Sequence, residues 1–430
     1  MFPRPRCHFG EKRTALALDL RPHGARRYPF HMVGCRWVPT LAALCCVSAY
    51  TADWPQWRGP NRDGISAETG LLDSWPSSGP PLVWKAQGLG EGYSSFAVVG
   101  DRLFTQGQQG NQEFVLAIDT KTGKELWRAP SGKAFHEQRG HGPRGTPTVD
   151  GTRLYAMAAD GTLLCLDTAT GKRIWGMNVV DKFGGRVPTW GISESPLVDG
   201  DRLIVTPGGH NASVVALNKD DGALLWKSQS DPAGYSSPMA FDSGGVRQVV
   251  VFTAREALGL AMKNGELQWR YDKVANNTAN IATPIVHDGH VFLSSDYGTG
   301  CALLKLGPGA SEVYFNRDMR NHYSTSVLIG DYVYGFSSGI LTAMKFLTGE
   351  VAWRNRSVGK GSVTYAEGKL YALSEDGVVG LVDATPDAYK ERSRFQIHQG
   401  SYPTWTPPVI ANGKLYLREQ DNLYCFNIKK

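Results

Sequence analysis

The sequence predicts an all-β chain folded as an eight-bladed β-propeller of four-stranded blades, with an N-terminal strand that closes the last blade. Three observations lead to this prediction. An eleven-residue pattern ending in tryptophan recurs along the chain, and turn-forming residues are abundant, with 50 Gly and 24 Pro in 430 residues. The final repeat also lacks one strand, which an unmatched segment near the start can supply. A hydrophobic fraction of 41% allows a sizeable core, and 20% charged residues are too few for a disordered or coiled-coil chain.

The repeat is clearest in two consecutive copies. Residues 117–127 read Ala-Ile-Asp-Thr-Lys-Thr-Gly-Lys-Glu-Leu-Trp, and residues 165–175 read Cys-Leu-Asp-Thr-Ala-Thr-Gly-Lys-Arg-Ile-Trp. Weaker copies keep the Gly and place a Trp four residues after it. We predict that the terminal rings are structural docking tryptophans that pack on the neighbouring blade. They are Trp84, Trp127, Trp175, Trp226, Trp269 and Trp353, and Tyr314 or Phe315 supplies the ring missing before the last of them.

Each repeat has the composition of four short strands joined by tight turns. It opens with Ser or Thr, often followed by Pro, and continues through an apolar pair, a Gly turn, two strands, and the Asp-x-x-Thr-Gly turn before the Trp strand. A period in the forties with these features is typical of a propeller blade. Glycine supplies positive φ in the second turn, and Asp119 or Asp167 can bond the turn amides. Repeats begin near residues 94, 146, 195, 237, 283, 325, 362 and 406.

The two ends of the repeat region complement each other. The eighth unit, residues 406–430, stops before any Trp strand, whereas residues 82–85, Leu-Val-Trp-Lys, form a Trp strand with no blade ahead of it. We predict that this N-terminal strand completes the last blade, so that the ring closes and both open sheet edges disappear.

The excess positive charge lies before the repeats. Residues 1–36 hold eight basic and two acidic residues, and from Asp53 onward 38 basic residues balance 38 acidic ones. The body of the protein therefore has no excess positive field for a phosphate backbone, and nucleic acid is excluded as a partner.

The N-terminal region predicts export. We assign residues 1–31 to a leader or mis-assigned start, 32–52 to a signal peptide, 53–81 to an N-terminal segment and 82–430 to the propeller. An apolar run at 37–49 ends in small residues, as a signal peptide does, and is too short for a membrane anchor. We expect a periplasmic or cell-envelope location, with membrane association only if Cys45 is lipidated, which the bulky Leu44 before it disfavours.

The cysteine pattern predicts neither disulfides nor a metal site. Four of the seven cysteines precede residue 53, and the other three are Cys165, Cys301 and Cys425. These three are an odd number without metal-ligand spacing, so we expect small buried residues in strands.

The tryptophan pattern resembles the repeat of the pyrroloquinoline-quinone (PQQ) superfamily, whose members are eight-bladed propellers. Residues 53–64, Asp-Trp-Pro-Gln-Trp-Arg-Gly-Pro-Asn-Arg-Asp-Gly, are further similar to exported bacterial PQQ-like repeat proteins of the BamB type. WD40 propellers are the alternative fold, but no Trp here is followed by Asp. The superfamily includes quinone-dependent alcohol and sugar dehydrogenases as well as scaffolds without a cofactor, so the resemblance alone does not choose between them.

Loops that precede the innermost strands of a propeller meet at one face around the central channel. In this sequence they are rich in polar and aromatic residues, which predicts a funnel that binds a small polar or planar ligand, with Arg144 or Lys360 meeting an anion. The alternative is a solvated channel mouth. The predicted funnel residues are His141, Arg144, Trp190, Glu194, Tyr235, Asn280, His322, Lys360 and Trp405.

The resemblance to quinone dehydrogenases implies PQQ held over Ca²⁺ by Glu and Asn oxygens, with an Asp base. Glu194 and Asn280 are weak candidates for the Ca²⁺ ligands. The predicted loops offer no Asp base, and the mature chain lacks a vicinal Cys pair and a Cys-x-x-Cys-His haem site. We therefore assign no catalytic residue and expect no cofactor, with PQQ and Ca²⁺ as the alternative.

The leading interpretation is an exported, monomeric, non-catalytic binding or assembly scaffold of the BamB type, whose partner is a protein or a small polar ligand. The alternatives are a periplasmic PQQ/Ca²⁺-dependent alcohol or sugar dehydrogenase, and a sugar-binding propeller without catalysis. We expect residues 54–60, with two tryptophans, to pack on the propeller rather than to form a docking peptide.

Overall fold

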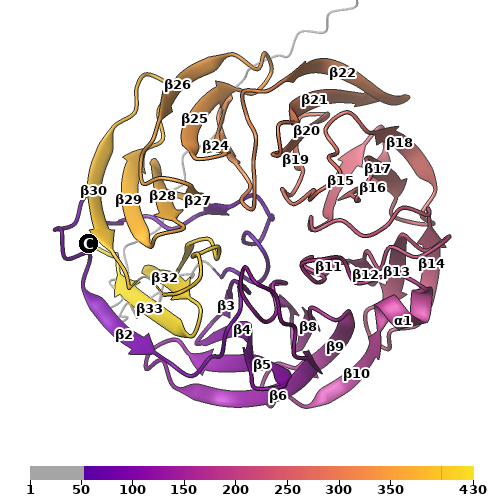
Figure 1. The fold of residues 1–430 in the computed structure, drawn as a ribbon, viewed down its shortest axis with the longest axis horizontal. Coiled ribbons are helices and arrows are strands. Elements are labelled where there is room, and N and C mark those ends of the chain that lie inside the picture. The colour runs from indigo at the N-terminus through magenta and orange to yellow at the C-terminus, as the bar shows by residue number, and fades with distance from the viewer. Residues whose placement is uncertain (1–52, 399) are drawn as a thin grey trace, which may run out of the picture. The chain divides into compact units, whose positions relative to one another are not determined.

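The computed structural model describes residues 53–398 and 400–430, so the predicted leader and signal peptide lie outside the described residues. In this part of the chain the strands form eight sheets, seven with four strands and one with five. Figure 1 shows the sheets arranged as blades that follow one another in chain order around a central axis. The predicted all-β, eight-bladed fold is confirmed.

The innermost strands begin close to the predicted repeat starts. Blades 1 and 2 consist of β3 (Ala97–Val99), β4 (Arg102–Gln109), β5 (Gln112–Asp119) and β6 (Glu125–Lys133), then β7 (Thr148–Asp150), β8 (Arg153–Met157), β9 (Thr162–Asp167) and β10 (Arg173–Asn178). Blades 3 and 4 consist of β11 (Leu197–Asp199), β12 (Arg202–Val205), β13 (Val214–Asn218) and β14 (Leu224–Ser228), then β15 (Met239–Ser243), β16 (Val246–Phe252), β17 (Ala257–Ala261) and β18 (Leu267–Tyr271).

The second half of the ring repeats this arrangement. Blades 5 and 6 consist of β19 (Ile285–His287), β20 (His290–Ser295), β21 (Gly300–Gly307) and β22 (Gly309–Asn316), then β23 (Val327–Ile329), β24 (Tyr332–Ser337), β25 (Ile340–Lys345) and β26 (Val351–Asn355). Blade 7 has β27 (Gly361–Ala366), β28 (Lys369–Ser374), β29 (Val378–Asp383) and β30 (Glu391–Gln396), with β1 (Ile65–Ser66) added parallel to β27. Blade 8 consists of β31 (Val409–Ala411), β32 (Lys414–Glu419), β33 (Asn422–Asn427) and β2 (Leu82–Ala86). The helix α1 (Val179–Phe183) follows β10.

The repeat motif builds a turn on which the preceding blade rests. Asp119 Oδ1 accepts hydrogen bonds from the backbone N–H groups of Lys121 and Thr122, and Gly123 has φ +70°. A Cβ on Gly123 would lie 2.7 Å from Cε3 of Trp84, whose Nε1–H donates to Thr120 O over 2.9 Å. The glycine is therefore required by both its backbone conformation and the indole above it.

The same contact recurs between most neighbouring blades. A ring of one blade donates a hydrogen bond to a backbone carbonyl of the next, in the pairs Trp127–Thr168, Trp175–Lys219, Trp226–Met262, Tyr314–Phe346 and Trp353–Thr385. Tyr314 rather than Phe315 therefore supplies the ring of blade 5. Trp269 is buried among residues of blades 4 and 5, but its Nε1–H donates to Gln248 of its own blade. The sequence after it replaces the Asp-x-x-Thr-Gly turn with Gly307-Pro308-Gly309.

Blade 7 obtains its docking ring from outside its own repeat. In β30, Ser393 occupies the position that tryptophan holds in other outer strands, and its Oγ accepts a hydrogen bond from the backbone N–H of Trp75. Trp75 packs edge-on against Phe395 at 5.7 Å and against Tyr371 at 5.8 Å. The N-terminal segment thus fills the gap in the repeat.

The predicted closure is confirmed. Strand β2 pairs antiparallel with β33, with Trp84 opposite Cys425. The fully buried Arg418 of β32 reinforces this junction, because its guanidinium donates to the carbonyl oxygens of Gly90, Ser94 and Gln106 in blade 1. Burial lowers the pKa of Arg418 to about 10.

The core consists of clusters of buried apolar residues shared by neighbouring blades. Cys165, Cys301 and Cys425 are buried, unpaired residues of these clusters, as predicted. Among the described residues, no helix has the length and apolar character to cross a membrane.

Candidate functional site

Hydroxyl groups link several of the loops before the innermost strands. At four blade junctions the Ser or Thr that opens a repeat accepts a hydrogen bond from the backbone N–H of the equivalent residue in the preceding blade. The pairs, donor first, are Ser95–Thr146, Thr146–Ser195, Ser195–Ser237 and Thr283–Thr325. These bonds satisfy backbone groups at the inner sheet edges. They explain why repeats begin with a hydroxyl residue, and they fix the loops at one face.

A second segment closes the channel beneath these loops. Residues 54–66, here called the plug, cross the middle of the molecule (Figure 1). Their hydrogen bonds reach blades 1, 2, 3, 5, 6, 7 and 8. Trp54 pairs its backbone with Val98 and is buried, which confirms that this segment packs on the propeller.

Two arginines hold the plug in place. Arg58 donates to the carbonyl oxygens of Thr325 and Ser326, and Arg62 donates to those of Ser195 and Pro196. Both side chains are buried, which lowers the pKa of Arg58 to about 10 and that of Arg62 to about 9. Since both groups stay charged at neutral pH, each bond is charge-assisted.

Above the plug lies a cavity of about 730 Å³. It is lined by side chains from the inner loops of the blades together with Trp57 of the plug. The aromatic residues are Trp57, Tyr93, Trp190, Tyr235, Tyr297, Tyr323, Tyr402 and Trp405, and the charged residues are Arg139, Arg144, Lys360, Glu375 and Asp376. We call this cavity the funnel.

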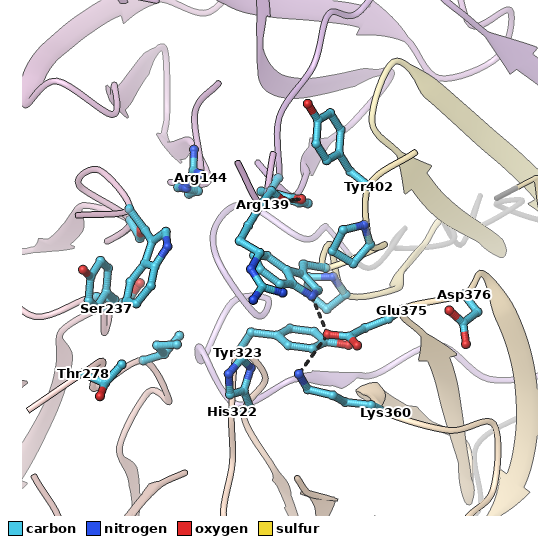
Figure 2. A pocket seen from close by; sticks show the side chains of 18 of the residues that line it. Arg139, Arg144, Ser237, Thr278, His322, Tyr323, Lys360, Glu375, Asp376 and Tyr402 are labelled. Atoms are coloured by element: carbon cyan, nitrogen blue, oxygen red, sulfur yellow. Dashed lines mark hydrogen bonds and ion pairs between the residues drawn. The ribbon is translucent and has the colours of Figure 1, made fainter. Parts of the chain in front are cut away.

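One wall of the funnel is a stack of rings tied to a carboxylate. Tyr323 and Trp405 stack with centroids 5.4 Å apart and planes at 28°, and Tyr93 lies 4.8 Å from Trp405. Trp405 Nε1–H donates to Glu375 Oε1 over 2.7 Å, and Lys360 Nζ lies 3.1 Å from the same oxygen (Figure 2). Glu375 therefore fixes the indole and neutralises the lysine at once.

The remaining wall combines rings with two guanidinium groups. Trp190 and Tyr235 contact each other at 5.5 Å. Arg144 lies over the rings of Tyr93 and Phe135 and donates to carbonyl oxygens of its own loop, so it is held rigidly. Arg139 is exposed, and Figure 2 shows it extending into the cavity. Its guanidinium has no hydrogen bond or ion pair with any described residue.

The structure places six of the nine predicted funnel residues in the cavity wall: Arg144, Trp190, Tyr235, His322, Lys360 and Trp405. His141 lies behind the wall, where its ring nitrogens contact the backbone N–H of Glu137 and the hydroxyl of Tyr402. His322 bonds Tyr297 through Nε2, and burial lowers the pKa of its imidazole, which is therefore neutral at neutral pH.

Glu194 and Asn280 are structural residues rather than parts of the cavity wall. Glu194 is 1% exposed, and its two carboxylate oxygens accept bonds from Thr206 N–H and Oγ1–H. Burial raises the pKa of Glu194 to about 7. Asn280 is equally buried, accepts from Asn276 N–H and donates to Thr253 O.

These contacts do not fit a Ca²⁺ site of the quinone dehydrogenase type. The oxygens of Glu194 and Asn280 are used within the fold, and the described residues contain no group of three or more His, Cys, Asp or Glu side chains placed to hold a metal. A hard cation needs several converging oxygen ligands. The predicted Ca²⁺ pair is therefore not supported by the geometry.

Sequence reasoning missed several residues of the cavity wall. Tyr93, Tyr323 and Tyr402 lie in loops that the repeat pattern had identified, and their aromatic character was the available signal. Glu375 follows β28 and precedes the next strand of the same blade, so a search confined to the loops before innermost strands could not find it. Trp57 belongs to the plug, which lies outside the repeats.

The comparisons with known proteins agree with this fold. The family described as outer membrane protein assembly factor BamB matches residues 76–181 and 111–355. BamB from Yersinia pestis is 24% identical over 293 residues, which are 64% of this chain and 71% of that protein.

Solved structures of two differently named proteins have the same fold. BamB from Moraxella catarrhalis matches with a TM-score of 0.61 and 17% identity, covering 82% of this chain and 98% of that one. Quinohemoprotein alcohol dehydrogenase from Comamonas testosteroni matches with a TM-score of 0.62 and 13% identity, covering 88% and 81%. The structural likeness supports the fold alone. Because the family match spans more than half of the residues, this chain belongs to the family described as outer membrane protein assembly factor BamB.

Proposed function

We propose that this chain is a non-catalytic binding module of the bacterial cell envelope, which holds its partner at the funnel. The observation that carries this proposal is a preformed cavity in which the carboxylate of Glu375 is committed to structure. Glu375 accepts a hydrogen bond from Trp405 and pairs with Lys360. A general base must instead be free to accept a proton from its substrate.

The rigidity of the funnel favours binding. The hydroxyl bonds between loops and the plug hold several of the loops, so few side chains lose freedom when a ligand enters. A preorganised cavity with aromatic walls and a few polar groups is the usual form of a ligand site. The relatives are named as outer membrane assembly factors, which supports a role in the envelope for this chain too.

The first arm of the experiment tests for catalytic turnover. Purified protein is incubated with PQQ and Ca²⁺ and supplied with alcohols or aldoses and an artificial electron acceptor. We expect no dye reduction. Dye reduction that depends on both additions would contradict the proposal and favour the dehydrogenase alternative.

A second arm measures binding directly. A panel of small polar compounds is screened by thermal shift and tryptophan fluorescence, with the double variant Arg139→Gln/Lys360→Gln as the funnel variant. Arg173→Gln is the matched control, because Arg173 lies on the outer strand β10 and its guanidinium donates to Gly176 O of the same strand. We expect at least one compound to bind the wild type and the control but not the funnel variant.

A further inference from the structure

We infer that the ligand of the funnel is an acidic saccharide, a sugar ring that carries a carboxylate; this inference rests on the proposed binding function. Three properties of the cavity lead to it: the ring faces that it presents, one cation without a bond to the described residues, and inner strand edges that are in part already occupied.

The rings of Trp190 and Tyr235 suit a sugar. They contact each other at 5.5 Å and both line the cavity, whereas Tyr323 and Trp405 stack on one another and are also contacted by Lys360 and Tyr93. A pyranose ring has C–H groups on its faces and hydroxyl groups around its rim. The C–H face packs on an aromatic ring, which buries apolar area, while the rim remains free to form hydrogen bonds.

Hydroxyl groups are present for the rim. Thr278, Tyr297 and Ser401 line the cavity in addition to Tyr235 and Tyr402. A hydroxyl both donates and accepts, so one side chain can meet a sugar hydroxyl in either orientation.

The charge of the funnel favours an anion. Its wall holds three cationic side chains and two acidic ones, and Glu375 already neutralises Lys360. Arg144 is held by carbonyl oxygens of its own loop. Arg139 extends into the cavity (Figure 2), and its guanidinium has no hydrogen bond or ion pair with any described residue, although its backbone bonds Glu137 and Tyr93. A guanidinium forms paired hydrogen bonds with a carboxylate, which places the acid group of the sugar beside Arg139.

A peptide is less well matched to this face. Peptides commonly bind by adding a strand to a free sheet edge. In the funnel the hydroxyl bonds and the plug occupy backbone groups at several of the inner edges, and Arg58 and Arg62 of the plug bond backbone carbonyl oxygens. Recognition must therefore proceed through side chains, which here are rings, hydroxyls and a guanidinium.

The test uses one sugar in two charge states. Digalacturonic acid and its methyl ester share the rings and nearly all the hydroxyls but differ in charge. Each is titrated into the purified protein by isothermal calorimetry at low and at high salt. We expect the acid to bind about tenfold more tightly than the ester, the effect of one charge-assisted contact, with the difference shrinking as salt is added.

Three variants locate the contact. Arg139→Gln is expected to remove the preference for the acid while the ester still binds. Glu375→Gln keeps an acceptor for the Trp405 indole but frees the charge of Lys360, so it is expected to strengthen binding of the acid severalfold and to leave the ester unchanged. A gain of this kind cannot arise from misfolding. Arg173→Gln, on the outer strand, is expected to behave as wild type.

Each other outcome overturns the inference. Equal binding of acid and ester, binding of neither sugar, or a preference that survives Arg139→Gln excludes the acidic saccharide. In these cases a different compound that binds the wild type and not the funnel variant leaves the proposed binding function standing. Dye reduction with PQQ and Ca²⁺ overturns both.

Discussion

Trp84 and Gly123 belong to the last and first blades, and the indole of the tryptophan lies directly on the backbone of the glycine. A side chain at residue 123 would meet the ring at 2.7 Å. This contact joins the two ends of the propeller at the point where the ring closes.

Gly123→Ala is therefore expected to lower stability more than a positive φ alone explains. Alanine at residue 123 must adopt a left-handed conformation, and its Cβ clashes with the buried indole of Trp84. Together these effects are expected to lower the free energy of unfolding by about 2–4 kcal/mol. Gly100→Ala is the matched control, since Gly100 also has φ +57° but nothing within 4 Å of an added Cβ. It should lose only about 1–2 kcal/mol. Chemical denaturation measures both, and equal losses would contradict a role for the indole.

Trp84→Ala is expected to lower the free energy of unfolding by about 3–5 kcal/mol. The substitution leaves a cavity in the cluster shared by blades 8 and 1, and it leaves the carbonyl of Thr120 without its donor. Leu82→Ala, on the same strand but 53% exposed, should change stability by about 0.5 kcal/mol or less. Thermal unfolding of the two variants tests the closure. A small loss at residue 84 would mean that β2 adds little to the ring.

Removal of a plug arginine is expected to destabilise the inner ring. Arg58→Met leaves the buried carbonyl oxygens of Thr325 and Ser326 without donors, at about 1–3 kcal/mol each. Lys121→Met, in the exposed turn of blade 1, is the control. Limited proteolysis should cut the variant within residues 54–66 while the control resists. An unchanged cleavage pattern would count against the plug as a held element.

The protein is expected to become less stable as pH rises from about 5 to 8. Glu113 is buried with its Oε2 accepting from Ala159 N–H, and burial raises its pKa to about 8. Above pH 4.5 the unfolded chain releases this proton while the folded chain retains it. The contribution of Glu113 to the free energy of unfolding is therefore fully present below about pH 4.5. It falls by up to about 1.4 kcal/mol per pH unit as the pH rises toward about 8.

Glu113→Gln removes one titrating group and should reduce that slope, while Glu194, whose pKa is raised to about 7, still contributes to it. Melting temperatures of the wild type and the variant, recorded at several pH values between 5 and 8, give the comparison. Identical slopes in the two proteins would show that Glu113 does not carry the effect.

The sequence was informative wherever a contact repeats. The positions of Trp84, Trp127 and Trp175 and the pairing of β2 with β33 followed from one motif, because every blade solves the same packing problem with the same residues. Trp269 occupies the motif position but forms no hydrogen bond to the described residues of the next blade, because the hairpin of that blade lacks the turn that would accept it. A periodic pattern predicts the common geometry and cannot indicate such a local exception.

The funnel was less predictable, because its residues do not repeat. The sequence predicted which loops reach the funnel, and six of the nine residues chosen from those loops line the cavity. The direction in which each side chain points depends on neighbours that the loop sequence does not show. Glu194 turns into the protein to meet Thr206, and Asn280 turns to cap its own loop. Trp75 and the plug come from a stretch without a repeat, so no internal comparison could reveal that they substitute for a missing ring and seal the channel.

The plug has a consequence for the order in which the molecule is made. Its partners include β27 and Ile410, close to the end of the chain, so the earliest part of the described sequence acquires its last contacts only after the final blade has been synthesised. Until then Ser66 lacks the carbonyl oxygen of Ile410 to which its hydroxyl donates. A nascent chain arrested before residue 410 should therefore keep this stretch open to a protease, and completion of the chain should protect the beginning and the end in a single step.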